Sequence, residues 1–168
     1  MSMSEPKLVY EGKHICPICK ANSLVVKEYI YNALHVGELE LSVWECENCG
    51  FRVRDVRPID SLKPIRLELK VENKDDLNVI LYRSAYANII IPELGIEVLA
   101  GETYQGVITT VEGILEIILD QLGSNCEGVE KCKEIERAKN GEIPFTLIIE
   151  DESGLSFIRS EKVKVTQL

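Results

Sequence analysis

The chain has 168 residues, a mass of 18.9 kDa and a formal net charge of −9, from 19 basic and 28 acidic residues. Hydrophobic residues make up 45% of it, which excludes a disordered chain, and the acidic balance disfavours general binding to nucleic acids or anionic membranes. No stretch approaches the ~20 apolar residues of a membrane helix, and the N-terminus lacks the pattern of a signal peptide. We therefore expect a soluble, cytoplasmic protein of one or two small domains.

The acidic residues are unevenly distributed along the chain. Residues 1–57 hold seven basic and eight acidic side chains, whereas residues 58–168 hold twelve and twenty. The change in composition falls beside Pro58, and proline interrupts a regular strand. We predict a first domain over residues 1–57, a second over residues 58–168, and a short, stiff connection over residues 58–64.

Four of the six cysteines form two C-x2-C pairs, Cys16 with Cys19 and Cys46 with Cys49, and 26 residues separate the pairs. Two such pairs supply the four soft ligands of a tetrahedral zinc site, with no position left for a catalytic water. A redox dithiol needs a single pair, and disulfides are rare in intracellular proteins outside hyperthermophiles. We predict one structural Zn²⁺ on these four cysteines, with iron as the alternative metal.

Short strands are expected around the four cysteines. Residues 24–31 are rich in Val, Ile and Tyr, and Leu39, Leu41 and Val43 alternate with polar residues. Residues 51–54 alternate again after the second pair. Three strands around a four-cysteine site describe a zinc ribbon, which buries too little surface to fold without its metal.

The second domain is predicted to be mainly β. Residues 65–72 alternate strictly between apolar and charged side chains, which is typical of a strand with one wet face. Further strands are expected at residues 77–82, 87–91, 96–98, 145–149 and 157–165.

A helical hairpin is predicted to interrupt these strands over about residues 109–140. Apolar residues at helical spacing indicate a first helix over 111–122, with Thr109 and Glu112 as a capping box and Gly123 at its end. A weaker second helix is expected over about 127–139.

The two remaining cysteines, Cys126 and Cys132, are six residues apart. On one helix that spacing places them on different faces, so a shared metal is not expected. We interpret them as free thiols, with a disulfide as the minor option if Cys126 lies in the turn before the helix.

Several motifs of this chain resemble those of the ZPR-type zinc-finger family, in the same order and over about residues 14–160. The cysteine pairs read C-P-I-C and C-E-N-C-G-F-R, and Asp76-Leu77, Arg83-Ser84 and an I-P-E-L segment follow. The sequence T-T-V-E-G-I-L from Thr109 is similar to the family's T-V-E-G-L-L. The sequence E-D-E-S-G-L-S-F-I from Glu150 is similar to its D-D-P-S-G-N-S-F.

The resemblance implies a zinc ribbon followed by a β domain of the double-stranded β-helix type that carries the helical hairpin. The expected fold class is therefore mainly β (α+β), in the single-module, archaeal-like form. Eukaryotic members have two modules and bind translation elongation factor 1-alpha, whose folding they assist, so the resemblance implies this protein partner. The candidate partner-binding residues are Arg83, Glu93, Thr110, Glu112, Asp151, Ser153 and Ser156.

The alternative function is a nucleic-acid-binding zinc ribbon of transcription or the ribosome. The basic residues that it would use lie among acidic ones and are Lys13, Lys20, Arg52, Arg54 and Arg57. An enzyme is not expected, because oxygenases of the double-stranded β-helix type need histidines and residues 58–168 contain none.

Overall fold

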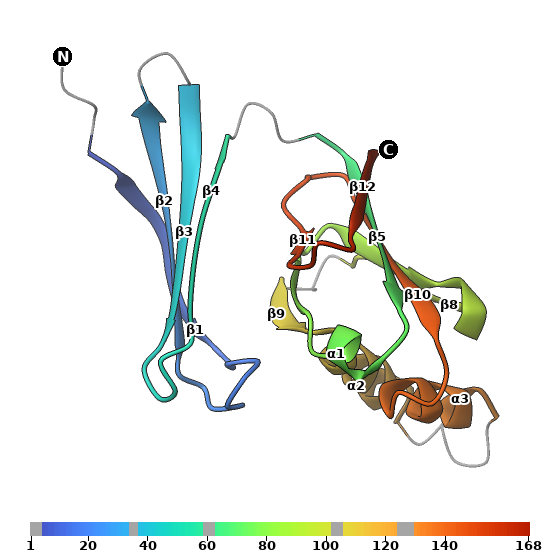
Figure 1. The fold of residues 1–168 in the computed structure, drawn as a ribbon. Coiled ribbons are helices and arrows are strands. Elements are labelled where there is room, and N and C mark those ends of the chain that lie inside the picture. The colour runs from blue at the N-terminus through green and yellow to red at the C-terminus, as the bar shows by residue number, and fades with distance from the viewer. Residues whose placement is uncertain (1–4, 34–36, 59–62, 102–105, 124–129) are drawn as a thin grey trace. The chain divides into compact units, whose positions relative to one another are not determined.

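The computed structural model describes residues 5–33, 37–58, 63–101, 106–123 and 130–168. Two compact units make up the chain, Met1–Leu62 and Lys63–Leu168 (Figure 1). Within the described residues, every helix is too short or too polar to cross a membrane.

The first unit is an antiparallel sheet whose strands are paired in chain order. Its strands are β1 (Lys7–His14), β2 (Leu24–Ala33), β3 (Gly37–Cys46) and β4 (Arg52–Pro58). The three strands predicted around the cysteines correspond to β2, β3 and β4. No hydrophobic pattern predicts β1, because Leu8, Val9 and Tyr10 are 43–48% exposed and follow no alternation.

The buried face of β3 differs from the predicted one. Near the cysteines the buried side chains are Ser42, Trp44 and Cys46, while Leu41 and Val43 are half-buried. Alternate residues of a strand share a face, so the residues that lie on the face of Cys46 are the even-numbered ones. The position of the cysteine therefore decides which residues are buried at this end of the strand.

The second unit contains two antiparallel sheets. The larger has the order β12-β5-β10-β7-β8, from β12 (Lys164–Gln167), β5 (Ile65–Val71), β10 (Phe145–Asp151), β7 (Ala87–Ile91) and β8 (Ile96–Val98). The smaller has the order β11-β6-β9, from β11 (Phe157–Ile158), β6 (Ile80–Arg83) and β9 (Val107–Thr110). Two sheets of antiparallel strands enclosing one core are the architecture of a jelly roll, so the predicted fold class is confirmed.

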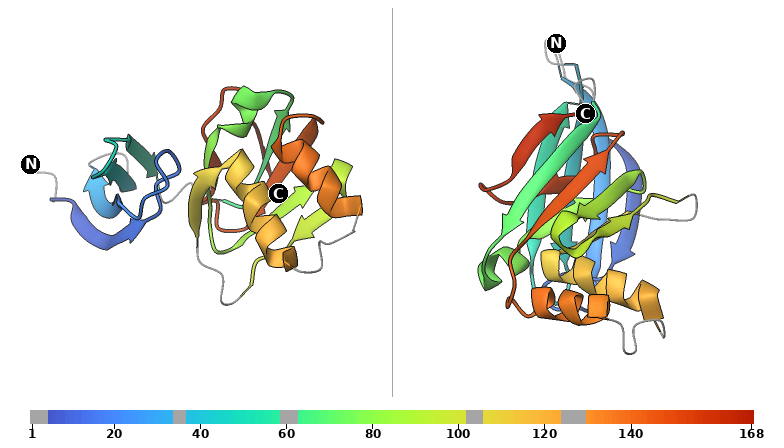
Figure 2. Two further views of the ribbon diagram at one scale, coloured as in Figure 1. Left: turned by 90° about the horizontal axis from the view of Figure 1, so that it is seen from below. Right: turned by 90° about the vertical axis from the view of Figure 1, so that its right-hand side faces the viewer.

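The helices of this unit are α1 (Lys74–Leu77), α2 (Val111–Leu122) and α3 (Glu130–Lys139), with a 3-10 turn η1 (Pro92–Leu94). Figure 2 shows α2 and α3 side by side at one end of the sheets. The apolar side of α2 joins the core formed by β5, β7 and β10, where Ile114, Leu115, Leu69 and Ile149 are at most 1% exposed. The helical hairpin predicted from spacing therefore completes the hydrophobic core.

Two predicted strands and one cap are corrected by the structure. Residues 77–82 are not one strand, since Leu77 ends α1 and β6 begins at Ile80. The side chain of Asn73 caps α1 by accepting a hydrogen bond from the Asp76 amide. Residues 157–165 form two short strands, β11 and β12, that belong to different sheets.

The N-cap of α2 is Thr110 and not Thr109, and no capping box forms. Thr109 pairs with Leu81 inside the β6–β9 ladder. Thr110 keeps an extended backbone, and its hydroxyl accepts a hydrogen bond from the Gly113 amide at 3.0 Å. The helix ends as predicted, with Gly123 directly after Leu122.

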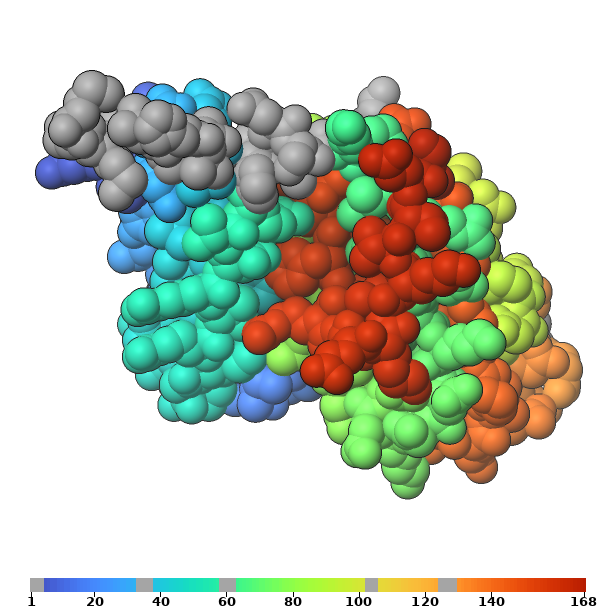
Figure 3. Space-filling view, turned by 45° about the horizontal axis from the view of Figure 1, so that its top comes forward, coloured from blue at the N-terminus to red at the C-terminus, as the bar shows by residue number. Residues whose placement is uncertain are grey.

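The C-terminal residues form one edge of the larger sheet. β12 pairs with β5, and Figure 3 shows these residues in red at the surface, beside the green residues of β5 and α1. Lys162 ties this segment to α1 through an ion pair of 2.6 Å with the buried Asp76. The carboxylate also accepts the Glu72 amide, so it joins three segments of the chain.

Candidate functional site

The four cysteines of the two pairs gather at one end of the first unit. Their sulfur atoms all lie within 4.8 Å of one another, and none of the four is in a disulfide. Cys16 Sγ is 3.7 Å from Cys49 Sγ, and Cys19 Sγ is 3.6 Å from Cys46 Sγ. A zinc tetrahedron with Zn–S bonds of about 2.3 Å has sulfur–sulfur edges of about 3.8 Å. The cluster has the size and the donor set to hold one zinc ion.

The same local turn builds both cysteine pairs. In the first pair the Lys20 amide donates to the Cys16 carbonyl at 2.9 Å, and in the second the Gly50 amide donates to the Cys46 carbonyl at 3.1 Å. Lys20 and Gly50 occupy equivalent positions and have positive φ angles of 67° and 79°. A left-handed residue after each second cysteine reverses the chain, so both thiols of a pair face one point.

Backbone amides point at the sulfurs. The amide of Ile18 lies 3.4 Å from Cys16 Sγ, and the amide of Cys49 lies 3.3 Å from Cys46 Sγ. Burial raises the pKa of Cys46, but hydrogen bonds from the Ser23 hydroxyl and from backbone amides outweigh it and lower the pKa to about 6. Donors of this kind stabilise a thiolate, which is the form that binds a metal.

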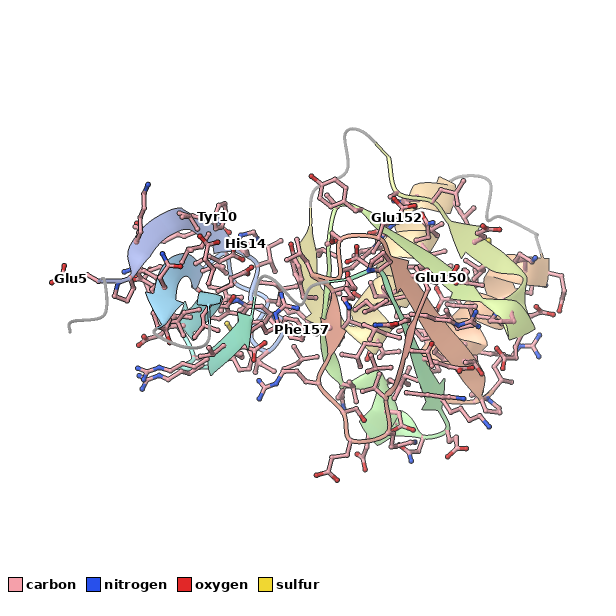
Figure 4. All side chains as sticks on the ribbon, turned by 90° about the horizontal axis from the view of Figure 1, so that it is seen from above. Glu5, Tyr10, His14, Glu150, Glu152 and Phe157 are labelled. Atoms are coloured by element: carbon pink, nitrogen blue, oxygen red, sulfur yellow. The ribbon has the colours of Figure 1, made fainter. Side chains whose placement is uncertain are left out.

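His14 stays outside the cysteine cluster. The ring of His14 lies on β1 against Tyr10, and its Nε2 is 2.9 Å from the Tyr10 hydroxyl (Figure 4). Burial lowers the pKa of His14, so its ring is neutral at pH 7. The structure places no histidine of the described residues among the four sulfurs.

A second cluster of polar residues lies in the jelly roll, where the Asp151 carboxylate is fully buried. Its Oδ1 accepts hydrogen bonds from the amide and hydroxyl of Ser153, at 2.8 and 2.6 Å. Its Oδ2 accepts the hydroxyl of Ser84 at 2.7 Å and both the amide and the hydroxyl of Ser156. These bonds join the turn after β10 to the turn after β6, which are 67 residues apart in sequence.

Arg83 lies beside this cluster and is 1% exposed. Its guanidinium donates twice to the carbonyl of Ala87, at 3.1 and 2.9 Å. The next residue, Ser84, donates its amide to the Ser156 hydroxyl at 2.9 Å. The structure thus brings three of the candidate residues, Asp151, Ser153 and Ser156, together, with Arg83 beside them. Ser84 also belongs to this cluster, although it was not predicted as a partner-binding residue.

The other candidate residues lie elsewhere on the jelly roll. Glu93 is the second residue of η1 and is exposed as a residue, yet its carboxylate accepts hydrogen bonds from the amide and hydroxyl of Thr146 at 2.9 and 2.7 Å. Thr110 is 7% exposed and caps α2, and Glu112 is half-exposed in the first turn of that helix. Burial raises the pKa of Glu93, but the bonds from Thr146 outweigh it and lower the pKa.

Cys132 is buried in α3 and takes part in a disulfide, so its prediction as a free thiol is wrong. The helical spacing argument assumed that both cysteines lie on one helix, but α3 begins at Glu130. Cys126 lies outside the described residues.

Taken together, the ribbon and the jelly roll define a zinc-binding protein module with a four-cysteine centre. The family model of the ZPR1 jelly-roll domain matches residues 75–167. The chain belongs to the ZPR1 family.

Two archaeal relatives resemble almost the whole chain. A ZPR1-like protein of Pyrococcus horikoshii is 33% identical over 167 residues, which cover 91% of this chain and 75% of that protein. A ZPR1-like protein of Methanocaldococcus jannaschii is 34% identical over 160 residues, which cover 89% and 81%. The zinc finger chaperone of Schizosaccharomyces pombe is 28% identical over 164 residues, which span 35% of that longer protein.

Proposed function

We propose that the protein is an interaction module that binds translation elongation factor 1-alpha and assists its folding in the cytoplasm. The observation that carries this proposal is the similarity to a relative named as a zinc finger chaperone. The excess of acidic residues over 58–168 supports a basic, tRNA-binding partner, because complementary potentials accelerate encounter. The proposal involves no catalytic step.

The candidate partner-binding residues are proposed to act in two ways. Glu112 and Ser153 are partly exposed, and Glu93 lies on an exposed turn, so these three are proposed to touch the partner. The buried candidates are proposed to hold the contact surface in shape, through the hydrogen bonds described above. They are Arg83, Thr110, Asp151 and Ser156.

The nucleic-acid alternative finds less support in the geometry of the ribbon. Lys13 pairs with Glu47 at 3.3 Å and Arg52 pairs with Glu45 at 3.2 Å. Arg57 lies within 4.0 Å of two further carboxylates. Paired in this way, the basic side chains present little net charge to a phosphate backbone.

Affinity capture tests the proposed partner. Zinc-loaded, tagged protein is compared with a Cys16→Ser/Cys19→Ser variant in a lysate of the source cells, and purified elongation factor 1-alpha is then titrated directly. We expect enrichment of the factor over the variant and saturable binding. An equal yield from both baits, or no binding of the purified factor, would refute the proposal.

A charge reversal on α2 tests the contact surface. Glu112→Lys is expected to weaken binding at least about fivefold, whereas Asp120→Lys, an equal charge change on the same helix, is expected to have little effect at 0.15 M salt. Equal losses in both variants would mean that general charge, and not contact by Glu112, supports binding.

A further inference from the structure

Ser23 lies between the two cysteine pairs. It follows the first pair in sequence and directly precedes β2. Its carbonyl accepts the Glu47 amide of the second pair at 2.9 Å. The next residue, Leu24, is paired with Cys46 in the β2–β3 ladder. The backbone therefore fixes Ser23 against the second pair.

The side chain of Ser23 points at the sulfurs of the cluster. Its hydroxyl oxygen is 3.0 Å from Cys46 Sγ and 3.9 Å from Cys19 Sγ. A cysteine that holds zinc is a thiolate and has no proton to donate, so in the metal-bound protein the hydroxyl must be the donor. A hydroxyl that donates to an anionic sulfur forms a charge-assisted hydrogen bond.

Water cannot easily replace this donor. Cys46 is 2% exposed, whereas Cys49 is exposed and can be solvated. Four thiolates around one Zn²⁺ carry a net charge of about −2, which the surrounding donors must stabilise. The buried sulfur of Cys46 depends on the donors that the chain itself provides, which include the Ser23 hydroxyl, the Cys49 amide at 3.3 Å and the Asn48 amide.

We propose that Ser23 is a positioning residue of the zinc centre, whose hydroxyl donates to the Cys46 thiolate, joins the two cysteine pairs and slows the loss of the metal. The inference rests on zinc occupying the four-cysteine site. Hydrogen-bonded partners of metal ligands typically contribute a factor of about 10 to 100 in metal affinity. The effect of Ser23 is expected near the lower limit, because the backbone amide donors to Cys46, from Asn48 and Cys49, remain.

The test compares zinc-loaded and cobalt-loaded forms of the full chain. Ser23→Ala removes the donor and Ser23→Thr keeps a hydroxyl. Ser42→Ala is the matched control, because Ser42 is a buried serine of the same sheet, four residues and about 13 Å along β3 from Cys46. Zinc release is followed with a colorimetric chelator, and the sulfur-to-cobalt charge-transfer band is recorded for each variant.

We expect Ser23→Ala to release zinc about tenfold faster and to bind it about tenfold more weakly. Its charge-transfer band should move to lower energy, because a sulfur without its hydrogen bond gives up an electron more readily. In Ser23→Thr the release rate, the zinc affinity and the band energy should stay close to those of the unchanged protein, and Ser42→Ala should match it in all three.

Two results would overturn the proposal while zinc binding itself stands. One is a Ser23→Ala protein whose release rate and cobalt band equal those of the unchanged chain. The other is faster release in both Ser23→Ala and Ser42→Ala with no shift of the band, which would indicate general loosening of the sheet. Failure of the unchanged chain to retain zinc would refute the zinc centre and, with it, the role of Ser23.

Discussion

Replacing Asp151 with asparagine should strongly destabilise the jelly roll. The carboxylate is fully buried and accepts hydrogen bonds on both oxygens, including the amides of Ser153 and Ser156. In asparagine one oxygen becomes an NH₂ group. If that group replaces Oδ1 it faces the Ser153 amide, and if it replaces Oδ2 it faces the Ser156 amide. Either orientation leaves a buried N–H without an acceptor.

An unsatisfied buried donor costs about 1–3 kcal/mol, and hydrogen bonds to a charged group contribute about 1.5–3 kcal/mol each. We expect Asp151→Asn to lower the free energy of unfolding by about 3 kcal/mol, measured by urea unfolding of the zinc-loaded chain followed by circular dichroism. The matched control is Glu152→Gln at the neighbouring exposed position (Figure 4), with an expected effect within about 0.5 kcal/mol. Equal stabilities of the two variants would refute this account of the cluster.

Lowering the pH should remove the stabilisation that the Asp151 carboxylate provides. Burial raises the pKa of Asp151, but hydrogen bonds from the three serines outweigh it and hold the pKa below its ordinary value of 3.8. The stabilisation is therefore complete above about pH 5 and is lost as the pH falls below about 4, through the pKa of the folded state. The melting temperature should fall less between pH 5 and pH 3 in Asp151→Asn than in the unchanged chain, and parallel curves would contradict this.

Two further substitutions or modifications test other parts of the structure. Gly113→Ala should destabilise the protein by about 1–2 kcal/mol in thermal unfolding, although alanine has the better helix propensity, because the added Cβ would overlap Thr109 Oγ1. The control is Gly101→Ala, which has open space around it and should change the stability by less than about 0.5 kcal/mol. Equal effects of the two substitutions would contradict the packing argument. In the zinc-loaded protein, iodoacetamide should modify the exposed Cys49 before the fully buried Cys16. Peptide mass mapping measures the order of modification, and the reverse order would refute the assigned exposures.

The metal centre could be predicted from the sequence because the two ligands of each pair lie only three positions apart in the chain. Two residues between cysteines determine how each pair directs its sulfurs, so Cys16, Cys19, Cys46 and Cys49 were identifiable before the structure. The helix over 111–122 was identifiable for a similar reason, since its buried residues recur at a fixed spacing.

The buried polar cluster could not be predicted in this way. The hydrogen bond between Ser84 and Asp151 joins positions 67 residues apart, and no periodic pattern encodes such a pair. The turn motif around Ser153 led to the prediction of partner-binding residues there, but the motif does not show that its polar side chains point into the protein. As a result, residues chosen as candidates for partner contact include some that are fully buried.

Local competition explains the misassigned strand at residues 77–82. Residues 77–82 are mostly apolar and include Val79, Ile80 and Tyr82, a composition that favours a strand. The side chain of Asn73 nonetheless caps a helical turn at 3.0 Å from the Asp76 amide. This capping bond, between residues three apart, therefore prevailed over the strand-favouring composition, and the strand begins only at Ile80.

The central claim is that this chain holds one zinc ion on four cysteines. Native mass spectrometry, together with elemental analysis of the purified full chain, measures it most directly. We expect one zinc per chain, and loss of that zinc in a Cys16→Ser/Cys46→Ser variant, which removes one ligand from each pair. A chain that carries iron, or no metal after purification in the presence of zinc, would contradict the claim.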